Sequence, residues 1–380
     1  MINLKKKIGV ITGTRAEYGI LEPLIKKISE SKELELQLYV TAMHLSEFYG
    51  HTIDEIKYPI TAKIDMKIKE KNTKQDMTDS TAVGIKGFSE SFSKHNPDVV
   101  VVLGDRIEQF AAAYAAMVLG ISIAHIHGGD VSGGIDNYLR NMVTKMASIH
   151  FPASELSAKR VKAFGEEEWR IHVVGAPGLD SLLSRKITSK ADLAKKYNLN
   201  PEKDWALTIY HPDTTSTKSA GTEMKIILKS LERTDTQKII IYPNSDASSG
   251  LIINEIDKFV DEPDFSVFRS IEHNDFIGVM AGSAFMIGNS SSALIEAPSL
   301  GVPAINIGSR QNQREHGKSV IDIPHPSEAD VIVAIDKVTK DDKFISEVKK
   351  CISPYGDGKS SVRIVKLLEK LKIDERLLKK

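Results

Sequence analysis

The stretch KKIGVITGTRAEYGILEPLIKKI, residues 6–28, contains the strand, turn and helix that decide the fold. Its first part, IGVIT, is a short run rich in β-branched residues, which is typical of a buried strand. Its second part places apolar side chains at the spacing of one helix face, at Ile20, Leu21, Leu24, Ile25 and Ile28. A Gly-Thr-Arg turn joins the two parts. The stretch therefore predicts a strand–turn–helix unit, as found in parallel sheets covered by helices.

Short apolar runs of the same kind recur along the chain between longer helical patterns. They are LQLYV (36–40), VVVVL (99–103), ISIAHI (121–126) and HVVG (172–175), then WALTIY (205–210), KIIIY (238–242), FSVF (265–268), FMIG (285–288) and PAINIG (303–308). This alternation predicts an α/β protein with two Rossmann-like, doubly wound domains. Because Ala-Pro-Gly interrupts the pattern, we expect the domains to cover residues 1–177 and 178–357. The helically periodic segment 358–380 either packs back on the first domain or forms a solvated terminal helix.

The composition excludes several classes of protein. Lys and Arg number 51 and balance 51 Asp and Glu, so we expect no binding to nucleic acid and none to an anionic membrane surface. The longest uncharged run, residues 109–124, is shorter than the roughly 18 residues that span a membrane, and it predicts a buried helix followed by a buried strand. The apolar run near the start is too short for an export signal. The single cysteine, Cys351, excludes an intrachain disulfide and fits the cytoplasm.

Polar residues and glycines gather where the predicted strands end. Ligands of open parallel sheets bind beyond the carboxyl ends of the strands. In the first half these ends carry Arg15 and Gly19, His44, Asp105 and Arg106, and the run from His125 to Asp130; in the second half they carry His211, Asn244, Asp246, Ser290, Ser291, Ser292 and Arg310. If two such domains face each other, these residues line one cleft.

The segment GNSSSALIEAP, residues 288–298, predicts a buried strand that leads into a helix. Unpaired N–H groups of Ser290 to Ser292 at such a helix start suit a diphosphate. The Glu296 carboxylate can accept hydrogen bonds from vicinal ribose hydroxyls. The alternative is a capped helix whose glutamate complements the helix dipole. Arg15, Arg106 and Arg310 are either phosphate ligands or members of surface ion pairs.

Two histidines and three aspartates are candidates for acid–base chemistry. His125 and His127 alternate on a predicted strand, so we expect both on one face with Asp130 nearby. We interpret them as acid–base or structural groups and regard a metal site as the minor alternative. Asp105 and Asp136 each precede or begin a predicted helix, where a carboxylate is either a general base or a helix cap.

Six motifs together resemble the UDP-N-acetylglucosamine 2-epimerase family. They are GTRAEYG (13–19), GDR (104–106), HIHGGD (125–130), YHP (210–212), YPNSD (242–246) and GNSSSALIEAPSLGVPAINIGSRQ (288–311). GGDVSGGIDNYLR (128–140) and YHPDTTS (210–216) are more similar to the hydrolysing branch, which makes N-acetylmannosamine for sialic acid synthesis. The resemblance covers most of residues 8–325. It implies a glycosyltransferase-B-like fold with a UDP-sugar between two Rossmann-like domains.

The resemblance also implies roles for individual residues. It implies UDP contacts for Arg15, Arg106, His211, Asn244, Ser290, Ser291, Glu296 and Arg310, to which the strand-end argument adds Gly19, His44, Asp246 and Ser292. It implies that Asp105 and Asp136 are catalytic carboxylates. The chain departs from the family at His127, where Glu is more frequent, at Asp130, where the hydrolysing branch has Glu, and at Asn141, where a histidine is usual. The division of acid and base roles among Asp105, His127, Asp130 and Asp136 therefore stays open.

The function implied by the resemblance is hydrolysis of UDP-N-acetylglucosamine to N-acetylmannosamine and UDP, through elimination to a 2-acetamidoglucal and hydration. No metal or nicotinamide cofactor is required, and GTRAEYG is not a GxGxxG turn. One alternative is the same reaction on UDP-2,4-diacetamido-2,4,6-trideoxyglucose, a legionaminic acid precursor. A non-hydrolysing epimerase is disfavoured by Ile20, where that branch tends to have Lys. An inactive UDP-sugar-binding regulator is disfavoured by Asp105, Asp136 and His211 together. We expect a homodimer or homotetramer.

Overall fold

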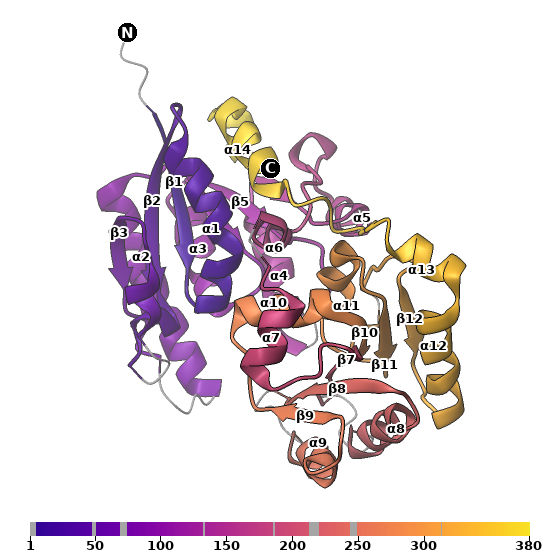
Figure 1. Ribbon diagram of the computed structural model, residues 1–380. Helices are drawn as coiled ribbons and strands as arrows, with labels where there is room; N and C mark the ends of the chain where they lie inside the picture. Colours follow the sequence, from indigo (N-terminus) through magenta and orange to yellow (C-terminus); the bar gives the residue numbers. More distant parts are fainter. Residues whose placement is uncertain are drawn as a thin grey trace. The chain divides into compact units, whose positions relative to one another are not determined.

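The chain folds into two compact units, which are visible in the computed structural model of Figure 1. The structure describes residues 5–47, 51–68, 74–131, 134–184, 187–212, 220–243, 249–312 and 314–380. The first unit comprises Met1–Ser184 and Tyr355–Lys380, and the second comprises Arg185–Pro354. The division falls later than the sequence pattern suggests, because helix α6 (Pro177–Ser184) packs against helices α1 and α14 of the first unit.

The first unit contains a six-stranded parallel sheet with the strand order β3-β2-β1-β4-β5-β6. Its elements are β1 (Lys6–Thr12), α1 (Arg15–Glu30), β2 (Leu34–Thr41), η1 (Ala42–Leu45), η2 (Thr52–Glu55), β3 (Ile60–Ile64), α2 (Lys74–His95), β4 (Val99–Leu103), α3 (Ile107–Val118), β5 (Ser122–Ile126), α4 (Gly134–Met146), β6 (Ile149–Phe151), α5 (Glu155–Ala163), η3 (Glu168–Arg170), α6, α14 (Ser360–Lys370) and α15 (Glu375–Leu378). In Figure 1 the yellow α14 lies beside the indigo α1, against which it packs.

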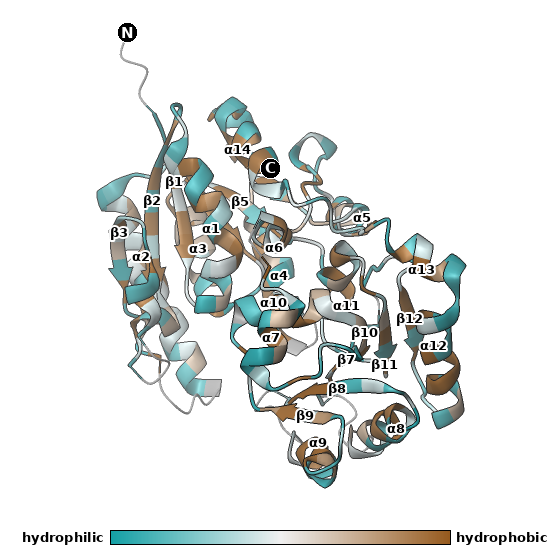
Figure 2. Cartoon of the chain, viewed as in Figure 1, coloured by the Kyte–Doolittle hydropathy of each residue, from teal (hydrophilic) through white to brown (hydrophobic). Residues whose placement is uncertain are grey.

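The inner strands of this sheet are buried on both faces. Ile8 and Val10 of β1 belong to one hydrophobic core, together with Leu24 of α1 and Ile364 of α14. Ile11 belongs to the core on the other face, with residues of α2 and α3. Figure 2 shows hydrophobic colour along the strands and mixed colour on the helices. Helices on both faces of a parallel sheet make this a doubly wound unit.

The second unit repeats this architecture with the strand order β12-β11-β10-β7-β8-β9. Its elements are α7 (Lys190–Tyr197), β7 (Asp204–Ile209), α8 (Ala220–Glu232), β8 (Thr236–Ile241), α9 (Ser249–Ile256), η4 (Asp257–Phe259), β9 (Phe265–Phe268), α10 (His273–Gly282), β10 (Ser283–Gly288), α11 (Ser292–Ile295), η5 (Ala297–Leu300), β11 (Ala304–Ile307), β12 (Val320–Ile323), α12 (Glu328–Lys340) and α13 (Asp342–Val348). All its strand pairs are parallel. The prediction of two doubly wound domains is confirmed.

Several predicted elements differ in detail. HVVG (172–175) is not a strand: the last strand of the first sheet is β6, and the segment after it contributes only the bridge from His150 to Ile171. Strands β3 and β12 were not anticipated. Each is a short edge strand that is only partly buried and mixes apolar with polar residues, so neither shows a strong apolar run.

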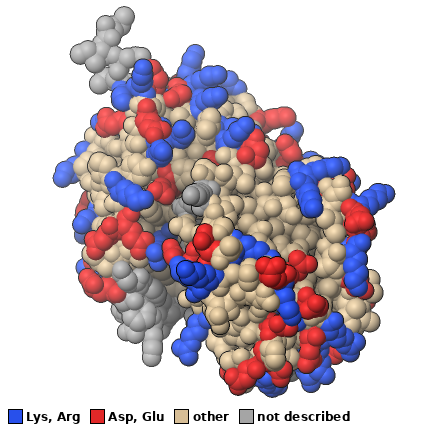
Figure 3. All heavy atoms as spheres, viewed as in Figure 1, with Lys and Arg blue, Asp and Glu red and all other residues tan. Residues whose placement is uncertain are grey.

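The predicted helix followed by a strand at residues 109–124 is confirmed by α3 and β5. Within the described residues, every helix is too short or too polar to cross a membrane. Basic and acidic side chains are mixed over the face shown in Figure 3, with no extended field of one sign.

Candidate active site

Neighbouring strands β1, β4 and β5 end in residues that the sequence singled out. Arg15 begins α1 after β1, Asp105 follows β4 and His127 follows β5. Gly104 has a φ of +71°, and its N–H donates to the carbonyl of Ile126 over 3.0 Å. A positive φ suits glycine, so this turn fixes the direction of the chain just before Asp105.

Helix α4 presents a row of polar side chains to these strand ends. Asp136, Arg140 and Thr144 are spaced four residues apart and so share one helix face. The buried Arg140 forms an ion pair with Asp105 through Nη2, and its Nη1 donates to the carbonyl of His127 over 2.8 Å. Arg140 therefore holds Asp105 close to His127. In the sequence Arg140 stands out only as part of a motif, although its spacing of four residues from Asp136 is a usable signal.

His127 forms a pair with Asp130. Its φ of +63° is rare for a residue other than glycine and marks a strained backbone position, as often occurs at functional sites. His127 Nδ1 lies 2.8 Å from Asp130 Oδ2, and Ser157 Oγ donates to Asp130 Oδ1 over 2.6 Å. Burial raises the pKa of Asp130, but the charge and hydrogen bond of His127 outweigh it and lower the pKa to about 2. An ionised Asp130 thus orients the His127 ring, as in acid–base pairs.

His125 does not share this role, and the expectation that it lies on one face with His127 is wrong. His125 lies within β5 and is fully buried, with Nε2 2.8 Å from the carbonyl of Gly104 and Nδ1 3.2 Å from Thr144 Oγ1. His127 comes after the strand, where the backbone leaves the extended conformation. No three His, Cys, Asp or Glu side chains in the described part of the chain are grouped to hold a metal ion.

The carboxyl group of Asp136 has a raised pKa. Burial is the largest cause, the charge of Asp105 adds to it, and Arg106 and Arg140 oppose it. Asp136 therefore keeps a proton to a higher pH than an ordinary aspartate. Acid–base sites typically contain neighbouring carboxyl groups, one of which keeps its proton to a higher pH than the other.

The structure adds two buried glutamates that are not among the site residues predicted from the sequence. Glu17 and Glu108 stand in the first turns of α1 and α3. Arg106 Nε donates to Glu108 Oε1 over 2.6 Å and lies 3.9 Å from Glu17 Oε1. The signal for Glu108 was its position two residues after Arg106 in the strand-end motif, but sequence spacing does not show that Glu17 meets it.

The remaining candidates of the first unit differ in their surroundings. Arg15 is exposed and pairs with Glu55 over 2.9 Å. A Cβ at Gly19 would meet no described atom within 4 Å, so packing does not require glycine there.

His44 is buried, and its two ring nitrogens lie 3.0 and 2.8 Å from the hydroxyl groups of Thr12 and Thr52. Burial lowers the pKa of His44 to about 4. These contacts fit a structural role for His44, and its part in substrate binding stays a prediction.

In the second unit a single asparagine connects the ends of strands β7, β10 and β11. Asn289 Oδ1 accepts the His211 N–H over 2.7 Å, and its Nδ2 donates to the His211 carbonyl over 2.8 Å. Its own carbonyl accepts from Arg310 Nη1 over 3.0 Å. Gly288 precedes it with a φ of +140°, and a Cβ there would lie 1.9 Å from the carbonyl of Ile209. The structure thus brings His211 and Arg310 together next to Ser290.

The segment from Ser290 to Glu296 has the predicted order of strand and helix, but its helix is short. Strand β10 ends at Gly288, and α11 covers only Ser292–Ile295. The Ser292 N–H is bound to Ser290 Oγ over 3.3 Å, so the expectation that it is unpaired is wrong. Ser291 directly precedes α11, and Glu296 directly follows it. Asn244 and Asp246 lie outside the described residues.

Comparisons with known proteins agree on one family. The family model for UDP-N-acetylglucosamine 2-epimerase matches residues 26–369. The chain is 36% identical over 380 residues to the UDP-N,N'-diacetylbacillosamine 2-epimerase (hydrolyzing) of Legionella pneumophila, covering 99% of this chain and 98% of that one. It is 35% identical to the polysialic acid biosynthesis protein P7 of Escherichia coli, covering 96% of this chain and 94% of that one.

The fold is also that of a solved structure. UDP-GlcNAc 2-epimerase from Neisseria meningitidis, bound to UDP-GlcNAc, superimposes with a TM-score of 0.80 at 20% identity. The match covers 96% of this chain and all of that one.

Proposed function

Because the chain belongs to the UDP-N-acetylglucosamine 2-epimerase family, we propose that it is a hydrolysing 2-epimerase that converts UDP-N-acetylglucosamine and water to N-acetylmannosamine and UDP. The observation that carries the proposal is the group formed by Asp105, Asp136 and the His127–Asp130 pair. These acid–base groups gather at the ends of β4 and β5 and on α4, and one carboxyl has a raised pKa. The reaction needs such groups because it removes one proton from carbon and returns another.

The proposed chemistry has two stages. In the first, a base removes the C2 proton while the C1–O bond to UDP breaks, which gives a 2-acetamidoglucal and UDP. In the second, water supplies a hydroxyl to C1, and an acid delivers a proton to the opposite face of C2. We assign the first proton transfer to Asp105, which Arg140 holds in place. His127 and Asp136 provide the remaining transfers.

We assign UDP binding mainly to the second unit. His211, Ser290 and Arg310 lie together around Asn289, with Glu296 one short helix away. Ser291, Ser292, Asn244 and Asp246 remain candidates on the strength of the motifs. From the first unit, Arg15, Gly19 and Arg106 stay candidates for UDP contacts. Cationic and hydrogen-bonding groups of this kind stabilise charge that develops on a departing diphosphate.

A second candidate function is the same reaction on UDP-2,4-diacetamido-2,4,6-trideoxyglucose, the UDP-N,N'-diacetylbacillosamine of the Legionella relative. The observation that favours it is the 36% identity to that relative over nearly the whole chain. The two substrates share the bonds that react and differ only at C4 and C6, so one set of catalytic groups serves both.

Incubation of the purified protein with each UDP-sugar tests the proposal and separates the two candidates. Released UDP is measured, and the sugar product is identified by NMR. Free N-acetylmannosamine supports the first substrate, and a free 2-epimerised diacetamido sugar supports the second. A UDP-linked epimer would show a non-hydrolysing enzyme, and absence of UDP release from both would contradict the proposed reaction.

Replacing Glu296 with Ala is expected to weaken the binding of UDP itself by about 1.5–3 kcal/mol, the range for hydrogen bonds to a charged group. Titration calorimetry with UDP measures the effect. Glu328→Ala is the control, since Glu328 is another glutamate at a helix end of the second unit, in the first turn of α12, and pairs with Arg233. If both variants bind UDP equally well, Glu296 serves only the local helix.

We further propose that the enzyme is cytoplasmic and forms a homodimer or homotetramer. The single cysteine, exposed Cys351, fits a reducing compartment.

Support for self-association comes from helices α3 and α4. The two helices pack against each other, and their outward faces expose large apolar side chains: Tyr114, Met117, Val118, Tyr138 and Met142. Equal numbers of basic and acidic residues leave no net repulsion between two copies. We therefore propose a second copy of this chain as the occupant of this apolar face.

The double variant Val118→Glu and Met142→Glu is expected to dissociate the oligomer, because charge on an apolar contact must be desolvated. Light scattering coupled to size-exclusion chromatography measures the mass. Val333→Glu is the control, since Val333 is equally exposed but lies on α12. An unchanged mass of the double variant would place the contact elsewhere.

A further inference from the structure

Two buried glutamates lie against Arg106 and have no part in the proton transfers assigned above. The side chains of Glu17 and Glu108 are 8% and 1% exposed. The Arg106 Nε–H donates to Glu108 Oε1 over 2.6 Å, and Glu17 Oε1 lies 3.9 Å from the same nitrogen. One guanidinium group therefore faces two carboxyl groups from two different helices.

The two carboxyl groups are held rigidly by their neighbours. Glu17 Oε2 accepts the Gly13 N–H over 2.8 Å, and Gln109 Nε2 donates to Glu17 Oε1 over 3.3 Å. A Cβ at Gly13 would lie 2.5 Å from Glu108 Oε1, so this position must be glycine for the pair to pack. The other oxygen of Glu108 is buried and accepts no hydrogen bond from the described residues. An unsatisfied buried oxygen of this kind needs a physical explanation.

The charges of the group do not balance when both carboxyl groups are ionised. Two negative charges and the one positive charge of Arg106 leave a net negative charge in a buried place, which is costly. Burial, and then the charge of Glu108, raise the pKa of Glu17 to about 8. The Asp136 side chain on α4 also interacts electrostatically with Arg106 and Glu108. Asp136 interacts in the same way with Asp105 and Arg140. At neutral pH Glu17 therefore retains its proton.

We infer that Glu17 and Glu108 are positioning residues that set the orientation and effective charge of Arg106 toward the substrate diphosphate, Glu17 as a protonated and Glu108 as an ionised carboxyl group. The inference rests on the proposed function, in which Arg106 contacts UDP. Glu108 occupies the Nε edge of the guanidinium and so leaves its terminal N–H groups for ligand oxygens. While Glu17 is protonated, the three side chains together carry no net charge, and Arg106 faces one anion instead of two.

The binding of UDP should therefore depend on pH in a defined direction. Above about pH 8 Glu17 loses its proton, the group becomes negative, and an anionic ligand is repelled. By linkage, bound UDP raises the pKa of Glu17, so UDP binding takes up a proton near pH 8. The charge of the ligand's diphosphate is constant in this range, because a terminal phosphate has its second pKa at about 6.

Titration calorimetry of the full-length protein with UDP, between about pH 7 and pH 9.5 and in two buffers of different ionisation enthalpy, tests the inference. For the natural protein we expect Kd to rise about tenfold across this range, with proton uptake near pH 8. For Glu17→Gln we expect neither the rise nor the uptake, because glutamine keeps the shape and carries no proton to lose. Glu108→Gln removes the charge that helps to raise the pKa of Glu17, so the proton uptake near pH 8 should be lost, and it is the second variant if the first does not fold.

Glu166→Gln is the matched control, because Glu166 is also a buried carboxylate of the first unit but bonds to His150 and Lys145 instead. It should keep the pH profile of the natural protein. If both glutamine variants at positions 17 and 108 keep that profile and its proton uptake, the inference is wrong and the proposed function stands. If the natural protein neither binds UDP nor releases it from a UDP-sugar, the proposed function fails, and the inference fails with it.

Discussion

Replacing Asp105 with Asn is expected to lower kcat about 10²-fold or more, because a positioned general base contributes on that order. Asparagine matches the shape of aspartate and still accepts a hydrogen bond from Arg140, so the fold should persist. It has no carboxylate to receive the C2 proton. UDP release from the preferred UDP-sugar measures kcat, and calorimetry should show unchanged affinity for UDP.

A change in pH dependence should accompany this loss. The charge of Asp105 helps to raise the pKa of Asp136, so its removal stabilises the ionised form of Asp136 and lowers that pKa. A step in the residual rate that belongs to Asp136 should then move to lower pH. Asp65→Asn is the matched control, because Asp65 also follows a strand of the first sheet, β3, and pairs with Lys67 over 2.6 Å. Near-normal turnover of the Asp105 variant would remove this residue from the mechanism.

The sequence predicted the fold well because buried parallel strands leave a simple signal. VVVVL (99–103) is buried at every position in β4, so its apolar run matches the strand completely. Strand β12, VIDI, has a polar residue in a four-residue edge strand, and β6 has only three residues. Short or edge strands carry too few apolar positions to stand out from the neighbouring loops.

The candidate site was predictable where it depends on strand ends, and unpredictable where it depends on long-range contacts. Asp105 and Asp136 were found because each stands at the junction of a strand or loop with a helix. Arg140 was missed as an organising residue because its partner, Asp105, is 35 residues away. Asn289 was missed for the same reason, since it bonds to the backbone of His211 across 78 residues.

Histidines show a further limit of prediction from sequence. His44 and His127 both follow strand ends, and nothing in their local sequence separates them. The structure separates them by partners: His44 lies between two threonine hydroxyls, and His127 pairs with a carboxylate. Burial lowers the pKa of His44 to about 4, so its ring stays neutral at physiological pH.

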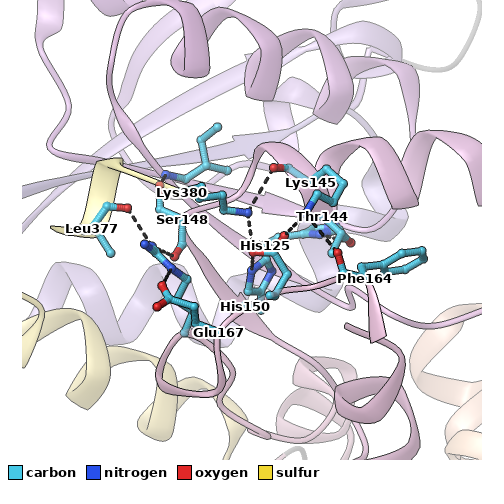
Figure 4. A network of polar contacts seen from close by, with 12 residues as sticks. His125, Thr144, Lys145, Ser148, His150, Phe164, Glu167, Leu377 and Lys380 are labelled. Carbon is cyan, nitrogen blue, oxygen red and sulfur yellow. Dashed lines mark hydrogen bonds and ion pairs between the residues drawn. The ribbon is translucent and has the colours of Figure 1, made fainter. Parts of the chain in front are cut away.

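Replacing Arg170 with Ala is expected to destabilise the first unit by about 3–5 kcal/mol, the cost of breaking a buried charged network. Arg170 is 1% exposed and donates to the carbonyl groups of Ser148, Arg376, Leu377 and Lys379 at 2.7 to 2.9 Å. Figure 4 shows Ser148 and Leu377, two of these partners, on either side of the network, beside the bond of Lys380 to the Lys145 carbonyl. Alanine leaves those carbonyls without their donor.

The measurable result is a fall in Tm of about 10 °C, given the usual relation between stability and Tm for a unit of this size. Arg233→Ala is the control: Arg233 is exposed, its contact is with Glu328 at 3.3 Å, and such surface pairs contribute little. Arg170→Lys should recover only part of the loss, because an ammonium group cannot replace a fork that reaches several carbonyls. Proteolysis should also cut residues 371–380 faster in the alanine variant, since these residues lose the donor that fixes their backbone. If Tm and cleavage both stay unchanged, the packing of α14 on α1 and α6 holds this segment without Arg170.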